Sequence, residues 1–230
     1  MEKINKLKRI TQNTLMLFVR ILILTIVNLY AVRLLLRGLG ACDYGIYNAV
    51  AGVVTLSSCL IPVFSQAIQR FYSYLSGKGE TEKQQTVFSV STNVVICFCI
   101  ILFLIFETAG IWMLNSQMMI PENRLYSANI AFQFAMFSFF FTLLQIPYTA
   151  AIYAHEEMGI YALVSCLDCV LKLLAAFLIG ITAIDNLVFY SISLSIIAII
   201  VFTTYMAYAK KHYTECRYTF IKSKSKYKKL

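Results

Sequence analysis

The sequence predicts an all-α fold, a polytopic membrane bundle of about six transmembrane helices, from three observations. Hydrophobic residues make up 60% of the 230 positions and charged residues 13%, about half the charged share of soluble domains. The mean hydropathy is +0.72. The apolar residues gather in continuous runs of the roughly 20 residues that a spanning helix needs, not in the short alternating segments of a β-barrel. The predicted spans are 13–36, 44–69, 87–113, 128–154, 158–181 and 186–209.

A tight turn is predicted between the first and second spans, in the stretch RGLGACDYG at 37–45. Glycine reaches backbone conformations that other residues avoid, and it permits close approach of a second helix. Gly38, Gly40 and Gly45 therefore suit a turn of this kind. Asp43 suits the N-cap of the second span, where its carboxylate would accept hydrogen bonds from free backbone N–H groups.

Kinks are predicted in the second and fourth spans, which contain Pro62 and Pro147. A proline inside a helix removes one backbone hydrogen bond and clashes with the preceding turn. Bent helices line cavities in many transporters, and a purely structural kink is the alternative.

The basic residues predict the orientation of the bundle. Most of the 20 Lys and Arg residues lie in the N-terminus, the loop between the second and third spans, and the C-terminal tail. Because such residues concentrate in cytoplasmic segments, we expect 1–12 to be a cytoplasmic basic N-terminus, 13–209 the six-helix lobe and 210–230 a cytoplasmic basic tail. The N-terminus would be either a short interfacial helix or a solvated segment. The net charge of +9 is then a topology signal, and nucleic acid is not an expected partner.

Few ionisable residues lie inside the spans, where they are costly and usually face the bundle interior. Asp168 and Lys172 lie four residues apart in the fifth span, so they can pair on one helical face. The pair would either fix helix packing or form the wall of a polar cavity. Arg20 in the first span would either face a cavity or extend to the membrane interface. Glu107 lies near the outer end of the third span.

A polar stripe is predicted on the fourth span. Ser138, Thr142, Gln145 and Thr149 recur at i, i+4, i+7 and i+11, so they share one helical face. Each could serve as a hydrogen bond between helices. The full stripe also suits the wall of a hydrated cavity.

Signals of enzyme chemistry are poor. The seven cysteines lie mostly inside apolar runs, and no histidine lies near the pairs Cys97/Cys99 and Cys166/Cys169, so metal binding is not expected. HEEM at 155–158 lacks the second histidine of a zinc motif, and GKG at 77–79 lacks the rest of a phosphate-binding loop. We therefore expect no catalytic residues and no cofactor.

Four short motifs occur in order along nearly the whole chain. The first is Arg33 followed by LG at 39–40 and DYGIYN at 43–48. The second is QRF at 69–71 with SGKGE at 76–80, and the third is IPY at 146–148 with Ala154, Glu156 and IYA at 160–162. The fourth is KKHYTECRY at 210–218. In order and spacing they resemble the polysaccharide flippase branch of the MOP superfamily, which also contains the MATE-like multidrug exporters.

The resemblance implies a bacterial inner-membrane protein that flips undecaprenyl-pyrophosphate-linked oligosaccharide, such as an O-antigen unit for lipopolysaccharide. Family members build a cavity between two lobes, and this chain matches the N-terminal lobe only. We therefore expect a second lobe or a homodimer, along with membrane lipids, as partners. A pyrophosphate needs cationic groups, so Arg20, Arg33 and Lys172 are the candidate substrate-binding residues. Arg33, one turn inside the first span, would either extend outward or face the cavity.

Two other functions stay open from the sequence. In a drug or cation antiporter of the same superfamily, Asp168 would be the ion-coupling residue. In a non-transporting scaffold for glycan assembly, none of these residues would bind substrate, and the chain would be the product of a truncated gene.

Overall fold

The structure is a computed structural model that describes residues 2–78, 81–180 and 185–218, and these ranges are helical, with no strand. Five helical segments are long and apolar enough to cross a membrane. The predicted all-α fold is confirmed. The first of these segments, Thr14–Leu75, contains both the first and the second predicted spans. The helices are α1 (Glu2–Leu56), α2 (Leu60–Lys78), α3 (Thr81–Ile105), α4 (Ile111–Ser116), α5 (Glu122–Leu144), α6 (Ile146–Ala154), α7 (Met158–Leu178) and α8 (Asn186–His212).

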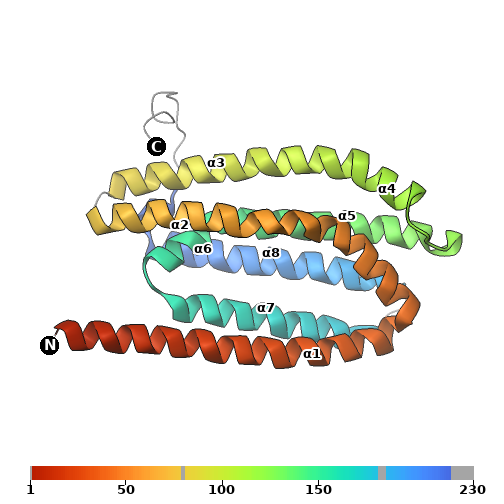
Figure 1. Cartoon of the computed structure of the whole chain (residues 1–230), viewed down its shortest axis with the longest axis horizontal. Coiled ribbons are helices and arrows are strands. Elements are labelled where there is room, and N and C mark those ends of the chain that lie inside the picture. The colour runs from red at the N-terminus through yellow and green to blue at the C-terminus, as the bar shows by residue number, and fades with distance from the viewer. Residues whose placement is uncertain (1, 79–80, 181–184, 219–230) are drawn as a thin grey trace.

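The predicted turn between the first two spans is a break within α1. Gly40 has φ 80° and ψ 167°, a conformation that costs glycine little and other residues more. The chain reverses its direction in this region (Figure 1). Gly38 is needed for a different reason, because a Cβ there would lie 2.8 Å from Cγ2 of Ile179. Since the helix resumes directly after Gly40, Asp43 lies in its first turn, and the predicted N-cap role was wrong.

Both predicted proline kinks are confirmed. A short 3₁₀ turn at Ser57–Cys59 interrupts the second span just before Pro62, and Gln145 separates α5 from α6 just before Pro147. In each case the break lies within five residues before the proline, at or close to the position whose carbonyl its ring would clash with. The third span bends without a proline, through a π-helical turn at Phe106–Gly110 that contains Glu107.

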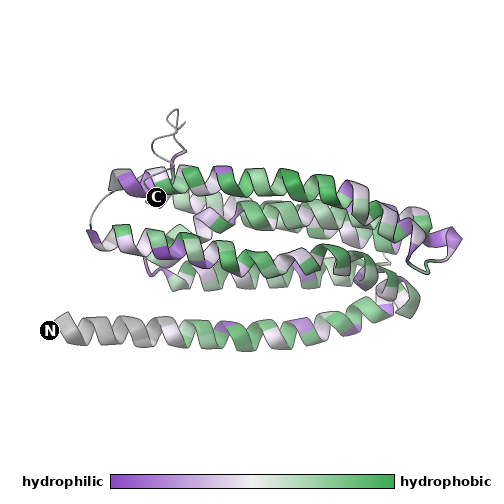
Figure 2. Cartoon of the chain, turned by 45° about the horizontal axis from the view of Figure 1, so that its top comes forward, coloured by the Kyte–Doolittle hydropathy of each residue, from purple (hydrophilic) through white to green (hydrophobic). Residues whose placement is uncertain are grey.

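The helices form a bundle of roughly parallel and antiparallel rods, and the start of α1 and the end of α8 lie at the same end (Figure 1). The first half of α1 packs along α7, α5 packs along α8, and α2 packs against α6. Apolar residues dominate the middle of the rods, and hydrophilic residues gather towards both ends (Figure 2). The N-terminal segment is helical and continues into the first span as one helix.

An ion-pair cluster joins three helices at the end of the bundle where α1 turns. Arg124 at the start of α5 pairs with Asp43 of α1 at 2.9 Å and with Asp185 at the start of α8. Asp185 also accepts a hydrogen bond from the backbone N–H of Leu187, and so caps α8. Asp43 is buried, so Arg124 neutralises a carboxylate that would otherwise be costly inside the bundle.

The chain after α8 packs back onto the opposite end of the bundle. Cys216 is fully buried, and Glu215 lies 2.6 Å from the imidazole Nε2 of His155. Glu157, in the turn before α7, accepts hydrogen bonds from the hydroxyls of Tyr208 and Tyr213 at 2.6 and 2.7 Å. This cluster, the tail clamp, fixes 213–218 on the bundle. The rest of the predicted basic tail, 219–230, lies outside the described residues.

Candidate functional site

A polar cavity of about 260 Å³ lies between α1, α7 and α8. It brings together three of the four residues that the sequence nominated: Arg20, Asp168 and Lys172. Most of its lining is polar, although the surrounding helices are apolar enough to cross a membrane. The remaining polar lining comes from Asn28, Gln145, Tyr161, Ser165 and Tyr205.

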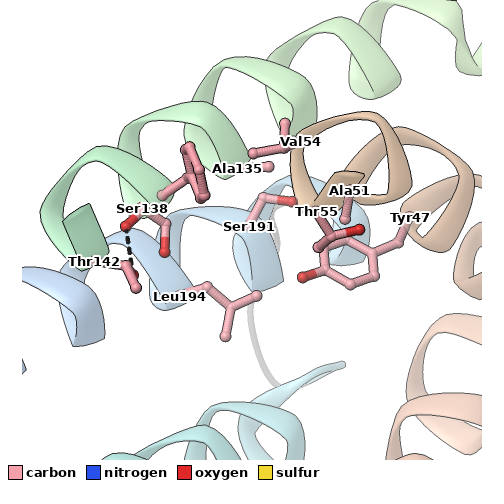
Figure 3. Close-up of a pocket in the computed structure, with 10 residues that line it drawn as sticks. Tyr47, Ala51, Val54, Thr55, Ala135, Ser138, Thr142, Ser191 and Leu194 are labelled. Carbon is pink, nitrogen blue, oxygen red and sulfur yellow. Dashed lines mark hydrogen bonds between the residues drawn. The ribbon is translucent and has the colours of Figure 1, made fainter. Parts of the chain in front are cut away.

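Two further cavities are linked to this one through shared lining residues. One of about 400 Å³ lies where α2, α5, α6 and α7 meet, and Gln145 and Tyr161 line both it and the first cavity. The other, of about 170 Å³, lies between α1, α5 and α8. Figure 3 shows its hydroxyl groups on all three helices, with Tyr47 and Thr55 on α1, Ser138 and Thr142 on α5, and Ser191 on α8. Because Thr142 lines both of these further cavities, we treat the three together as the inner cavity.

The predicted stripe on the fourth span lines this inner cavity. Ser138 and Thr142 lie on α5, Gln145 lies at the break, and Thr149 lies on α6; each lines at least one of the three cavities. The hydroxyls of Thr142 and Thr149 also donate to carbonyls of their own helices, those of Ser138 and Ile146. These bonds satisfy the hydroxyl protons locally and leave oxygen lone pairs for water or a solute.

Arg20 is the most unusual residue of the site. Its guanidinium carbon lies 4.3 Å from the centre of the Tyr161 ring, and Nη2 donates to the Tyr161 hydroxyl at 3.3 Å. Its Nε is buried and has no hydrogen-bond partner. Among the described residues, no ion pair involves Arg20. A buried donor without an acceptor is costly. Because no described carboxylate pairs with Arg20, an anionic ligand can bind its guanidinium without displacing an acid partner.

Asp168 and Lys172 form the predicted pair. Nζ of Lys172 donates to Asp168 at 2.7 Å along one face of α7, and the two side chains keep 45% and 30% of their exposure. The pair is therefore partly exposed at the cavity wall and neutral overall, and Lys172 can exchange its partner for another anion.

Arg33 lies apart from the other candidates. Its side chain is exposed on α1 and lines none of the three cavities. The structure thus places Arg33 on the exposed face of α1, outside the inner cavity of this lobe.

Sequence reasoning missed Tyr161, Ser165 and Tyr205. A signal for the first two was present, since Tyr161, Ser165, Asp168 and Lys172 recur at i, i+4, i+7 and i+11, the spacing of the stripe on the fourth span. Tyr205 offers no comparable signal, because it lies on the almost uniformly apolar α8 and only the packing of α8 against α7 brings it to the cavity.

The donor set of the inner cavity suits an anionic, hydroxyl-rich solute. The cavity offers two cationic groups, amide and hydroxyl groups, and tyrosine rings, which together can hold an anion and the hydroxyls of a sugar. Within the described ranges, no group of three or more His, Cys, Asp or Glu residues is arranged to hold a metal ion.

Comparison with protein-family models, with curated proteins and with solved structures found no match to this chain.

Proposed function

We propose that this chain forms a lobe of a membrane transporter that moves undecaprenyl-pyrophosphate-linked oligosaccharide across the bacterial inner membrane. The observation that supports this most is Arg20, a half-buried cation without an acid partner at the edge of a polar cavity. A pyrophosphate suits such a group, because a guanidinium binds phosphate oxygens through several charge-assisted hydrogen bonds. The low dielectric of a membrane bundle strengthens that attraction.

Lys172 and the polar stripe support the same function. Lys172 lies in the same cavity as Arg20 and offers a second cation. Its ion pair with Asp168 is partly exposed. The amide and hydroxyl groups along α5 and α6 offer the hydrogen bonds that a glycan needs. We propose further that a second lobe, from another chain or a second copy, faces this cavity, and that both termini are cytoplasmic because basic residues flank them.

Deletion of the gene in its own bacterium tests this function. We expect lipid-linked glycan to accumulate on the cytoplasmic leaflet and surface glycan to fall, and we expect the wild-type gene to restore both. Unchanged surface glycan in a strain without paralogous genes would contradict the proposal. Normal surface glycan together with recovery of glycosyltransferases bound to the tagged chain would instead indicate the scaffold role.

A drug or cation antiporter is the second candidate, and the presence of an acid, Asp168, in the cavity favours it. A coupling cation would have to displace Lys172 from its 2.7 Å contact with Asp168. Drug sensitivity of the deletion strain with normal surface glycan would support this function, and Asp168→Asn would then abolish ion-coupled export.

A further inference from the structure

The paired helices α1 and α7 have two chemically different sides. On one side lies the polar cavity that contains Arg20. On the other lies an apolar groove of about 360 Å³, lined by α1 from Leu15 to Ile23 and by α7 from Gly159 to Cys166. Leu15 and Leu163, both in its lining, are 61% and 63% exposed, so the groove is open on the outside of this helix pair. We call it the α1–α7 groove.

Arg20 lies on the border between the two sides. On α1 it belongs to the row with Leu24 and Asn28 that lines the polar cavity, and it also adjoins Val19 and Met16 in the groove. It is the charged residue in an otherwise apolar lining. A molecule that fills both spaces must therefore be apolar at one end and anionic where it passes Arg20.

Two of the α7 residues that line the groove are small. Gly159 and Ala162 contribute little side-chain volume, and a Cβ added at Gly159 would make an ordinary contact of 3.5 Å with Sδ of Met16. From Leu15 to Ile23 the groove runs about 12 Å along α1. A single slot of this kind between two helices holds one hydrocarbon chain, whereas a glycerophospholipid brings two.

We propose that the α1–α7 groove holds the first isoprene units of a polyprenyl pyrophosphate, with its pyrophosphate on Arg20 and its head group in the polar cavity. The proposal rests on the function proposed above and adds the place of the lipid chain. The guanidinium of Arg20, which lines both spaces and pairs with no acid among the described residues, supplies the donors, and the apolar groove provides the burial that holds the chain.

Lipid binding to the purified full chain in detergent, measured by native mass spectrometry, tests this. The probes are undecaprenyl pyrophosphate, undecaprenol and dioleoyl phosphatidylglycerol, with inorganic pyrophosphate as competitor. We expect Arg20→Gln to weaken the binding of undecaprenyl pyrophosphate by about tenfold and to leave the binding of undecaprenol unchanged, because only the charged head group loses a partner. We expect Ala162→Trp, which fills the groove, to weaken the binding of both polyprenyl probes by about tenfold.

A matched control is Val170→Trp, which adds the same side chain at a position on α7 that is 47% exposed and lies outside the groove. It should bind all probes like the wild type. Gly159→Leu is a second groove variant that inserts a smaller side chain. Its affinity for the polyprenyl probes should lie between that of Ala162→Trp and that of the wild type. Monodisperse elution and an unchanged unfolding temperature establish that each variant is folded.

The outcomes separate the groove from the transport function. If Arg20→Gln weakens undecaprenyl pyrophosphate while both folded groove variants bind it normally, the groove is rejected and the proposed function stands. Equal binding of phosphatidylglycerol and undecaprenyl pyrophosphate rejects the groove as a polyprenyl site. A wild-type chain that binds no polyprenyl probe contradicts both proposals.

Discussion

The guanidinium groups of Arg20 and Arg124 differ in the partners that surround them. Arg124 joins Asp43 and Asp185, so its charge is matched by two carboxylates that come from different helices. Arg20 has a tyrosine ring and hydroxyl beside it and a buried Nε without a partner. A cation between two acids holds helices together, whereas a cation without an acid is available to a ligand. The comparison therefore indicates a structural role for Arg124 and supports the binding role proposed for Arg20.

The largest effect is expected from Arg20→Gln. In the deletion strain it should restore on the order of a tenth or less of the wild-type surface glycan, because the pyrophosphate loses a charge-assisted partner. The unfolding temperature of the purified variant should be unchanged. Arg33→Gln is the matched control, since it removes the same charge from an exposed position on the same helix. Equal loss in both variants would contradict the assignment.

Arg124→Gln should destabilise the fold by about 2 kcal/mol, because it leaves the buried carboxylate of Asp43 without a cation. The effect is smaller than for a fully buried pair because Arg124 keeps 35% of its exposure. Thermal unfolding in detergent measures it.

The double variant Arg124→Gln, Asp43→Asn provides the control for this cluster. It removes the unpaired charge and should recover part of the lost stability. A single Arg124→Gln variant that keeps its stability but loses transport would show that Arg124 belongs with Arg20, and the comparison would fail.

A smaller effect is expected at the Asp168–Lys172 pair on α7. Lys172→Gln should lower transport by roughly threefold, because Lys172 is a second and more exposed cation. Asp168→Asn should leave transport equal or slightly higher, since it frees Lys172 for the substrate. Loss of transport in Asp168→Asn with Lys172→Gln unaffected would favour the cation antiporter.

The smallest effect is expected in the tail clamp. Burial would raise the pKa of Glu157, but hydrogen bonds from Tyr208 and Tyr213 outweigh it and hold the pKa below 4.5. A lowered folded-state pKa contributes stability above 4.5 that is lost as the pH falls through that lowered value. Tyr213→Phe should therefore cost about 0.5 kcal/mol at neutral pH.

A pH series of unfolding temperatures checks the sign of this effect. The difference between the wild type and Tyr213→Phe should shrink as the pH falls below 4.5, because a protonated Glu157 no longer favours the lost hydrogen bond. A difference that stays constant with pH would show that Tyr213 acts through packing, with its ring stacked 4.1 Å from that of His155.

Much of the fold followed from local sequence rules. Long apolar runs predicted the helices, a proline predicted each break in the second and fourth spans, and the spacing of Ser138, Thr142, Gln145 and Thr149 predicted a shared face. Each of these features depends on residues close together in the chain, so periodicity and backbone chemistry suffice to find it. The bend of the third span at Phe106–Gly110 has no such signal.

The site was less predictable because it depends on how helices face one another. Arg20 and Arg33 lie on the same apolar helix, where hydropathy gives no amphipathic pattern to tell the inner face from the outer one. Only the packing of α1 along α7 separates them. The partners of Arg124 lie 81 and 61 residues away along the chain, and no local rule links positions so distant.

Flipping in proteoliposomes tests the central claim most directly. Labelled undecaprenyl-pyrophosphate-linked oligosaccharide is reconstituted with the full chain, and a membrane-impermeant lectin reports the glycan that reaches the outer leaflet. The account predicts flipping by the wild type and by Arg33→Gln, and a loss of about tenfold or more in Arg20→Gln. Flipping by Arg20→Gln at the wild-type rate would contradict it.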